Sequence, residues 1–186
     1  MFIQTEETPN PATLKFLPGT TVLGARTMDF PDREAASASP LAARLFDIVG
    51  VDRVFFGGDF ITVTAREAEW HILKPPILGA IMEHFTAGLP VLEAGEMAAE
   101  GAEDAAEPGD DDDIVTQIKD LLDTRVRPAV AQDGGDIIFH GFQEGVVYLR
   151  MQGSCSGCPS STMTLKHGIE NLLRHYIPEV ESVEPV

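Results

Sequence analysis

Short apolar runs bounded by glycine and proline mark the first half of the chain, a pattern typical of strands. Residues 2–4 and 13–16 are expected to form two strands, because a Thr-Pro-Asn-Pro turn signal separates them. Residues 51–56 and 60–65 are expected to form a β-hairpin, since Gly57-Gly58-Asp59 between them favours a tight turn.

The same half contains two segments with helical spacing. Ser39 followed by Pro40 is typical of a helix start, because serine caps free N–H groups and proline fits the first turn. This helix is expected to end at Gly50, and a second one to follow Pro75-Pro76 and end before Gly88. The two apolar faces comprise Leu41, Leu45, Ile48 and Val49 in the first helix and Ile77, Ile81, Met82 and Phe85 in the second.

The second half reads as helix, two strands, helix and strand. Apolar residues recur at helical spacing over 114–126, and this helix is expected to end before Pro128. Residues 137–139 and 146–151 are expected to form an antiparallel pair of strands. A second helix and a short strand at 180–183 complete an α-β-β-α-β order.

Charge separates these two halves. The chain of 186 residues has 30 acidic and 13 basic residues, which gives a net charge of −17. Ten of the acidic residues and no basic residue lie in 93–113, and such a segment cannot bury enough apolar surface to fold. We therefore expect an α+β protein with two small α+β domains, 1–92 and 114–186, joined by an acidic flexible linker at 93–113.

Composition argues against several partners and compartments. The large negative charge opposes nucleic-acid binding, which depends on clustered Lys and Arg. No apolar run approaches the ~18 residues that a membrane span requires, so no membrane contact is expected. The first residues show neither a secretory signal nor an Arg-rich transit peptide, which predicts a cytoplasmic protein.

The two cysteines form the one pattern with a clear chemical meaning. Cys155 and Cys158 are spaced as Cys-x-x-Cys between an expected strand and an expected helix, where a helix start lowers thiol pKa values. Gly153 and Gly157 allow the backbone to approach a bound group, and Pro159 suits a first helical turn. A redox dithiol and half of a metal site are both compatible with this pattern. The short α-β-β-α-β order favours the metal site, because thioredoxin-like motifs occur in larger βαβ-type domains.

A metal site would need ligands from more than one chain. Structural zinc and the common iron–sulfur clusters take four protein ligands, whereas the chain has two thiols. His167 and His175 are about 12 Å apart along one expected helix, too far to bind one ion. His71, His84 and His140 are expected in the other domain or on a strand, as packing or surface residues. A two-fold homodimer would bring four sulfurs together, and is the simpler way to complete the site.

Longer stretches around these residues resemble a known family. Three segments of the second half resemble the C-terminal domain of the NifU family: 127–136 (RPAVAQDGGD), 153–161 (GSCSGCPSS) and 165–170 (LKHGIE). Three segments of the first half resemble the N-terminal domain of Nfu proteins: 1–5 (MFIQT), 8–16 (TPNPATLKF) and 70–76 (WHILKPP). Together these matches cover nearly everything outside the expected linker. Mitochondrial members of the family carry a transit peptide, so a cytoplasmic protein is expected here, with a mature organellar form as the alternative.

The resemblance implies an iron–sulfur cluster scaffold or carrier, not an enzyme, and no catalytic residue is assigned. Two subunits would bind one 4Fe-4S cluster through Cys155 and Cys158 of each, forming a homodimer on loading. Upstream cluster assembly machinery would be the donor, apo iron–sulfur proteins would be the recipients, and the N-terminal domain would contact partners. Lys166 and Arg150 are candidates to offset the charge of the cluster, or ordinary surface residues. A zinc-binding adaptor and a Cys-x-x-Cys dithiol oxidoreductase are the alternative functions.

Overall fold

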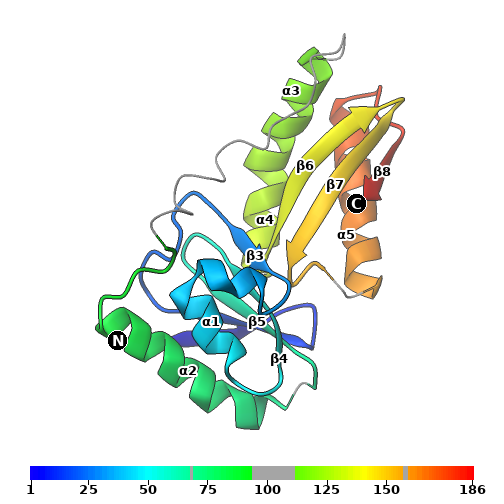
Figure 1. Ribbon diagram of the computed structural model, residues 1–186. Helices are drawn as coiled ribbons and strands as arrows, with labels where there is room; N and C mark the ends of the chain where they lie inside the picture. Colours follow the sequence, from blue (N-terminus) through cyan, green and yellow to red (C-terminus); the bar gives the residue numbers. More distant parts are fainter. Residues whose placement is uncertain (68, 94–111, 157–158) are drawn as a thin grey trace. The chain divides into compact units, whose positions relative to one another are not determined.

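The computed structural model forms two compact units, Met1–Ala102 and Glu103–Val186, each with its own helices and sheet (Figure 1). It describes residues 1–67, 69–93, 112–156 and 159–186. The expectation of two α+β domains is confirmed. The expected linker falls almost entirely on residues 94–111, outside the described residues, so its boundaries and flexibility stay a prediction.

The first unit is built on a five-stranded antiparallel sheet with the order β1-β2-β5-β4-β3. Its strands are β1 (Gln4–Glu7), β2 (Thr13–Leu17), β3 (Met28–Phe30), β4 (Val51–Phe56) and β5 (Ile61–Ala65). The hairpin expected around Gly57 is confirmed, because β4 and β5 pair with Phe56 opposite Ile61. The first strand begins two residues later than expected, and Phe2 is exposed. The edge strand β3 was not expected, because three residues are too few to show a period.

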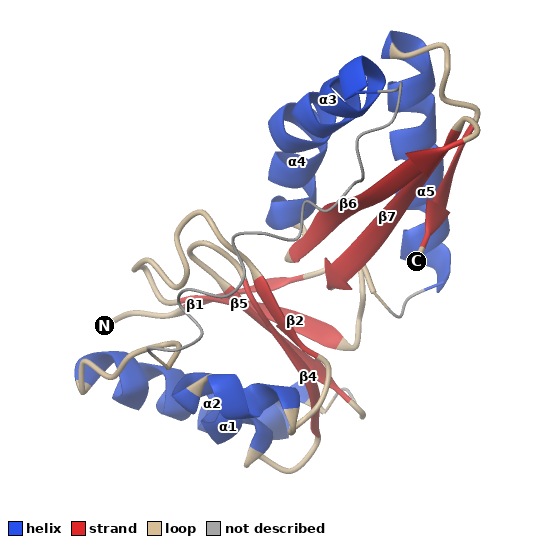
Figure 2. Ribbon diagram, turned by 45° about the horizontal axis from the view of Figure 1, so that its top comes forward, coloured by secondary structure: helices blue, strands red, loops and turns tan. Residues whose placement is uncertain are grey.

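One face of this sheet is covered by helices, as Figure 2 shows. They are the short 3₁₀ helix η1 (Ala35–Ala38), α1 (Pro40–Phe46) and α2 (Trp70–Thr86). The predicted cap is confirmed, since the Ser39 hydroxyl accepts a hydrogen bond from the Ala42 N–H at 3.1 Å. Leu41 and Leu45 are fully buried, whereas Val49 is 91% exposed. Placing Val49 on the apolar face was wrong, because α1 ends at Phe46 and the helical period does not reach it.

The second helix of the unit does not start where the sequence predicted. We expected it to follow Pro75-Pro76, but α2 begins at Trp70 and both prolines lie inside it. Proline removes a backbone hydrogen bond, a loss that burial of Leu73, Ile77 and Ile81 in the core offsets. Met82, expected on the packed side, is 46% exposed.

The chain after α2 is held against the first unit by two side chains. The Nε2 of His84, which is fully buried, lies 3.0 Å from the Pro90 carbonyl oxygen. The Ser39 hydroxyl donates to the Val91 carbonyl, and Leu92 is buried in the core. We call residues 90–92 the exit segment, and its packing extends the first unit to Leu92.

The second unit has the expected α-β-β-α-β order, which is confirmed. One helical segment comprises α3 (Asp112–Leu121), the π-helical turn η3 (Leu122–Val126) and α4 (Arg127–Gln132), followed by β6 (Gly135–Gln143), β7 (Val146–Gly153), α5 (Pro159–Tyr176) and β8 (Ser182–Pro185). Strand β7 pairs antiparallel with β6 and parallel with β8. Alternate residues of β7, among them Val147 and Leu149, share one core with the helices. No helix in the described part of the chain is long and apolar enough to cross a membrane.

The first helical segment of this unit continues past the proline that was expected to stop it. Pro128 lies in α4, and the helix runs on to Gln132. The π-helical turn at Leu122–Val126 directly precedes Pro128. Proline cannot donate to the carbonyl of Thr124 and its ring crowds that carbonyl, so a wider turn at this place accommodates it. A helical period read at 3.6 residues per turn does not reveal such a turn.

Candidate functional site

Cys155 lies in the turn between β7 and α5, where the sequence placed the Cys-x-x-Cys pair. Gly153, the last residue of β7, has a φ of +66°, and this left-handed conformation turns the chain out of the strand. Cys158, the second candidate ligand, lies outside the described residues.

The thiol of Cys155 packs against a glycine that is distant in sequence. A Cβ atom placed on Gly135 would lie 2.5 Å from the Cys155 Sγ and 2.8 Å from the Gln152 carbonyl oxygen. Glycine is therefore required at position 135 for the thiol to occupy its place. Pairing of β6 with β7 creates this contact, because Gly135 is opposite Gly153 in the register.

Burial sets the chemistry of this thiol. Cys155 is only 7% exposed, and burial raises its pKa to about 11. The negative charges of Asp133 and Asp136 raise this pKa further, whereas a hydrogen bond with Ser154 lowers it. The expectation of a lowered thiol pKa is therefore wrong for Cys155, because desolvation outweighs the start of the helix. The free side chain is a thiol at neutral pH.

Hydrogen bonds hold the backbone on both sides of Cys155. The Ser154 hydroxyl donates to the Asp133 carbonyl, and the Ser154 N–H donates to the Gly134 carbonyl at 3.2 Å. From α5, the Thr162 hydroxyl donates to the Cys155 carbonyl at 3.0 Å. The cysteine is thus connected both to the turn before β6 and to the helix that follows it.

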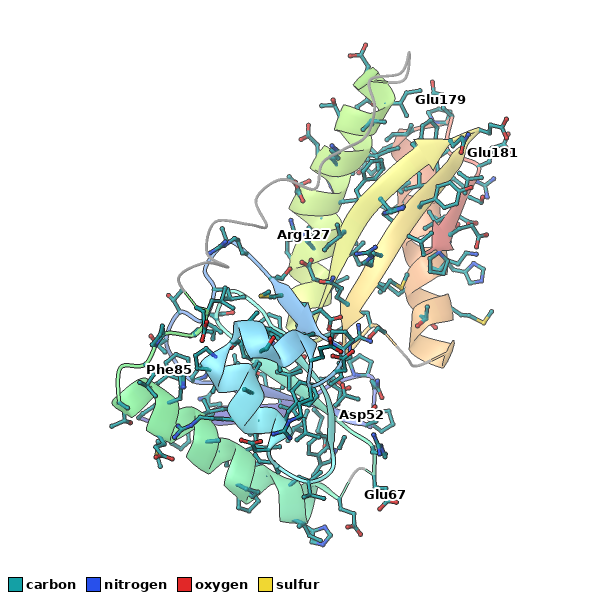
Figure 3. All side chains as sticks on the ribbon, in the orientation of Figure 1. Asp52, Glu67, Phe85, Arg127, Glu179 and Glu181 are labelled. Carbon is teal, nitrogen blue, oxygen red and sulfur yellow. The ribbon has the colours of Figure 1, made fainter. Side chains whose placement is uncertain are left out.

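An ion pair joins the end of the first helical segment to the start of β6. Arg127, labelled in Figure 3, donates from Nε and from a terminal guanidinium nitrogen to the two oxygens of Asp136, at 2.9 and 3.0 Å. Asp136 is 3% exposed and also accepts from the Ile137 N–H at 2.8 Å. These bonds raise the pKa of Arg127 above its usual value. The pair fixes the strand position next to Gly135, and sequence reasoning missed it although Arg127 and Asp136 are the two ends of the 127–136 segment that resembles the NifU family.

Other candidate ligands do not gather around Cys155. Within the described ranges, which leave out Cys158, no group of three or more His, Cys, Asp or Glu residues is placed to hold a metal ion. His167 and His175 both lie on α5. The Lys166 ammonium pairs with Glu184 at 2.9 Å, so its charge is partly offset within the unit. Arg150 lies on β7 and is exposed.

Comparison with known proteins identifies both halves. The family described as "Scaffold protein Nfu/NifU N terminal" matches residues 3–88, and the family described as "NifU-like domain" matches residues 118–184. The human protein named "NFU1 iron-sulfur cluster scaffold homolog, mitochondrial" is 55% identical over 188 residues, which cover 100% of this chain and 72% of the human one. The chain belongs to the Nfu family. The recognised resemblance is confirmed for both domains.

Nfu proteins of flies give the same result. The Drosophila virilis and Drosophila sechellia proteins carry the same name as the human one and are each 56% identical over 188 residues. The alignments cover 100% of this chain and 62% and 65% of those proteins, so the chain spans about two thirds of the length of its Nfu relatives. All three relatives are named as mitochondrial, so the expectation of a cytoplasmic protein is wrong. It rested on the first residues of the sequence, which are no guide when the relatives are longer.

Solved structures show a weaker likeness. A NifU-like protein of Saccharomyces cerevisiae matches with a TM-score of 0.45 and 26% identity, over 50% of this chain and 86% of its own. A Staphylococcus aureus protein matches with a TM-score of 0.39 and 24% identity, over 44% of this chain and 99% of its own. Scores at this level add nothing to the assignment to the Nfu family.

Proposed function

We propose that this chain is an iron–sulfur cluster scaffold that holds one 4Fe-4S cluster between two copies of itself and passes it to apo-proteins. Cys155 and Cys158 of each copy would be the ligands. The names of the Nfu relatives support an iron–sulfur role. The observation that carries the finer proposal is the thiol count, since two cysteines in one chain supply half of the four ligands that such a cluster takes.

The surroundings of Cys155 fit a sulfur ligand. Gly135 leaves space for the sulfur, and hydrogen bonds from Thr162 and to Asp133 and Gly134 fix the backbone next to it. Ligation requires a thiolate, so loading must remove the proton that the buried thiol holds at neutral pH. In this proposal the chain carries the cluster for delivery to other proteins, and it binds the cluster at the turn that contains Cys155.

Transfer would proceed by exchange of thiolates. Thiolates of the recipient replace Cys155 and Cys158 at the iron atoms one at a time, and each released cysteine takes up a proton. A recipient that offers all its ligands from one chain is favoured, because it does not have to keep two subunits associated. This exchange needs no general acid, general base or covalent intermediate on the chain.

Anaerobic reconstitution with iron and sulfide tests the proposal. The loaded protein should be brown, contain about four irons per dimer and elute as a dimer. Cys155→Ala and Cys158→Ala should each abolish loading, whereas His167→Ala should load like the wild type. A double cysteine variant that retains the cluster would refute the proposed ligands.

The two alternative functions give different results in the same experiment. Binding of zinc without colour would favour an adaptor. A dithiol oxidoreductase would turn over a disulfide substrate rapidly, which requires an attacking thiol with a pKa near the ambient pH. The raised pKa of the buried Cys155 counts against that role for this thiol.

A further inference from the structure

The backbone carbonyl of Cys155 accepts a hydrogen bond that belongs neither to the β-sheet before it nor to the helix after it. Strand β7 ends at Gly153 and α5 begins at Pro159, so neither the sheet nor the helix ladder reaches this carbonyl. Its donor is the hydroxyl of Thr162, at 3.0 Å. A side chain of α5 thus holds the backbone of the cysteine from seven residues away.

This hydrogen bond works together with a second one on the other side of the cysteine. The Ser154 hydroxyl, which is buried, donates to the Asp133 carbonyl in the turn before Gly135. Ser154, the residue before Cys155, is therefore bonded to the β6 turn, and the Cys155 carbonyl is bonded to α5. With the backbone held in this way, the Cys155 side chain is directed against Gly135.

We propose that Thr162 is a positioning residue for cluster binding, which acts through the backbone of Cys155. Its hydroxyl keeps the Cys155 thiol in place against Gly135 in the cluster-free chain and keeps the ligand sulfur in place when a cluster is bound. The second half of this inference rests on the proposed scaffold function. The first half concerns the free chain and is tested without any cluster.

The test in the free chain uses a background with one thiol. In Cys158→Ala, Cys155 is the single cysteine, and its alkylation by iodoacetamide at a fixed pH reports its accessibility. Thr162→Val keeps the shape of the side chain and removes the hydroxyl, and should raise the rate about 2- to 10-fold, the equivalent of one net hydrogen bond. Thr162→Ser, which retains the hydroxyl, should restore the slow rate. If Thr162→Val does not fold by circular dichroism, Thr162→Ala is measured in its place.

A matched control exists in the same unit. The Thr124 hydroxyl also donates to a backbone carbonyl, that of Asp120 at 2.6 Å, but within the first helical segment. Thr124→Val therefore removes the same chemical group and should leave the alkylation rate unchanged. An equal rate in Thr162→Val and its parent, or an equal increase in Thr124→Val, would overturn the positioning role in the free chain.

The test in the loaded protein uses both native cysteines. After reconstitution, decay of the visible absorption in the presence of a chelator should be about 2- to 10-fold faster in Thr162→Val, with wild-type decay in Thr162→Ser. Equal decay in Thr162→Val and the wild type would overturn the role in cluster retention. Failure of the wild type to load would instead refute the scaffold function, and the alkylation result would still decide the role of Thr162.

Discussion

Gly135 and Cys155 are in direct contact across the start of the β6–β7 pair. The space that a methyl group would need at position 135 is filled by the Cys155 sulfur and the Gln152 carbonyl oxygen, at 2.5 and 2.8 Å. The backbone oxygen cannot rotate away as a side chain can. A side chain larger than hydrogen at position 135 would therefore clash with both atoms.

Gly135→Ala should displace Cys155 and destabilise the second unit. Overpacking of this kind costs about 1–3 kcal/mol. Thermal unfolding gives the stability change, and reconstitution should show reduced cluster loading. Gly141→Ala is the matched control, because it lies on the same strand and a Cβ there meets nothing within 4 Å. Equal stability and loading in both variants would contradict the steric role of Gly135.

Arg127→Gln should leave the buried Asp136 carboxylate without its charged partner. Removing one member of a buried ion pair is costly, and with the Arg127 side chain 36% exposed we expect a loss of about 2 kcal/mol. Urea unfolding of the wild type and the variant measures it. In the control Arg174→Gln, the pair with Glu170 at 3.9 Å is more exposed, so the change should stay below about 1 kcal/mol. Similar losses in the two variants would argue against the special role of the Arg127 pair.

His84 should make the first unit less stable in mild acid. Burial lowers the pKa of His84 below 6.5, so the folded state keeps a neutral ring while the unfolded state takes up a proton. The contribution of the neutral ring is complete above about pH 6.5 and is lost as the pH falls towards the lowered pKa. Melting curves from pH 8 to 5 should therefore show a steeper loss in the wild type than in His84→Gln.

The exposed His71 of the same helix supplies the control for this pH effect. His71→Gln should follow the wild-type curve throughout, since the side chain of His71 is exposed and its replacement disturbs no buried contact. His84→Gln retains an amide donor for the Pro90 carbonyl, so the comparison isolates the protonation. A His84→Gln profile parallel to the wild type would show that His84 does not set the acid limit.

Cys155 should react slowly with alkylating reagents up to alkaline pH. With a pKa of about 11, the thiolate fraction of the folded chain grows about tenfold per pH unit from pH 7 to 9.5 without levelling. The rate of alkylation of Cys158→Ala, followed over time at each pH, measures this profile. The alkylation rate of the same chain unfolded in urea should begin to level near pH 9, the ordinary pKa of a cysteine thiol. A folded profile that also levels there would contradict the effect of burial.

The sequence predicted those elements that depend on local signals. The Ser39 cap, the β4–β5 hairpin and the α-β-β-α-β order all follow from residues within a few positions of each other. Both helices that contain prolines were predicted, but their continuation through Pro75-Pro76 and through Pro128 was not, because core packing and a π-helical turn offset the local effect of proline.

At the candidate site, the Cys-x-x-Cys pattern predicted the position of Cys155 but not its surroundings. Gly135 is twenty positions before it in the chain, and strand register alone brings the two together. The raised pKa of Cys155 depends on that burial, so no local motif could indicate it. The contact from Thr162 likewise depends on the path of the turn into α5.

The exit segment determines how the first unit responds to mechanical load. Ser39 at the start of α1 and His84 near the end of α2 both bind carbonyl groups of residues 90–92. A pull on the chain beyond Glu93 therefore acts first on the backbone hydrogen bond from the Glu93 N–H to the Ala38 carbonyl, at 3.1 Å, and then on these two side-chain hydrogen bonds. All three hydrogen bonds join the segment to helices and none joins it to a strand, so we expect the helices to be disturbed before the five-stranded sheet.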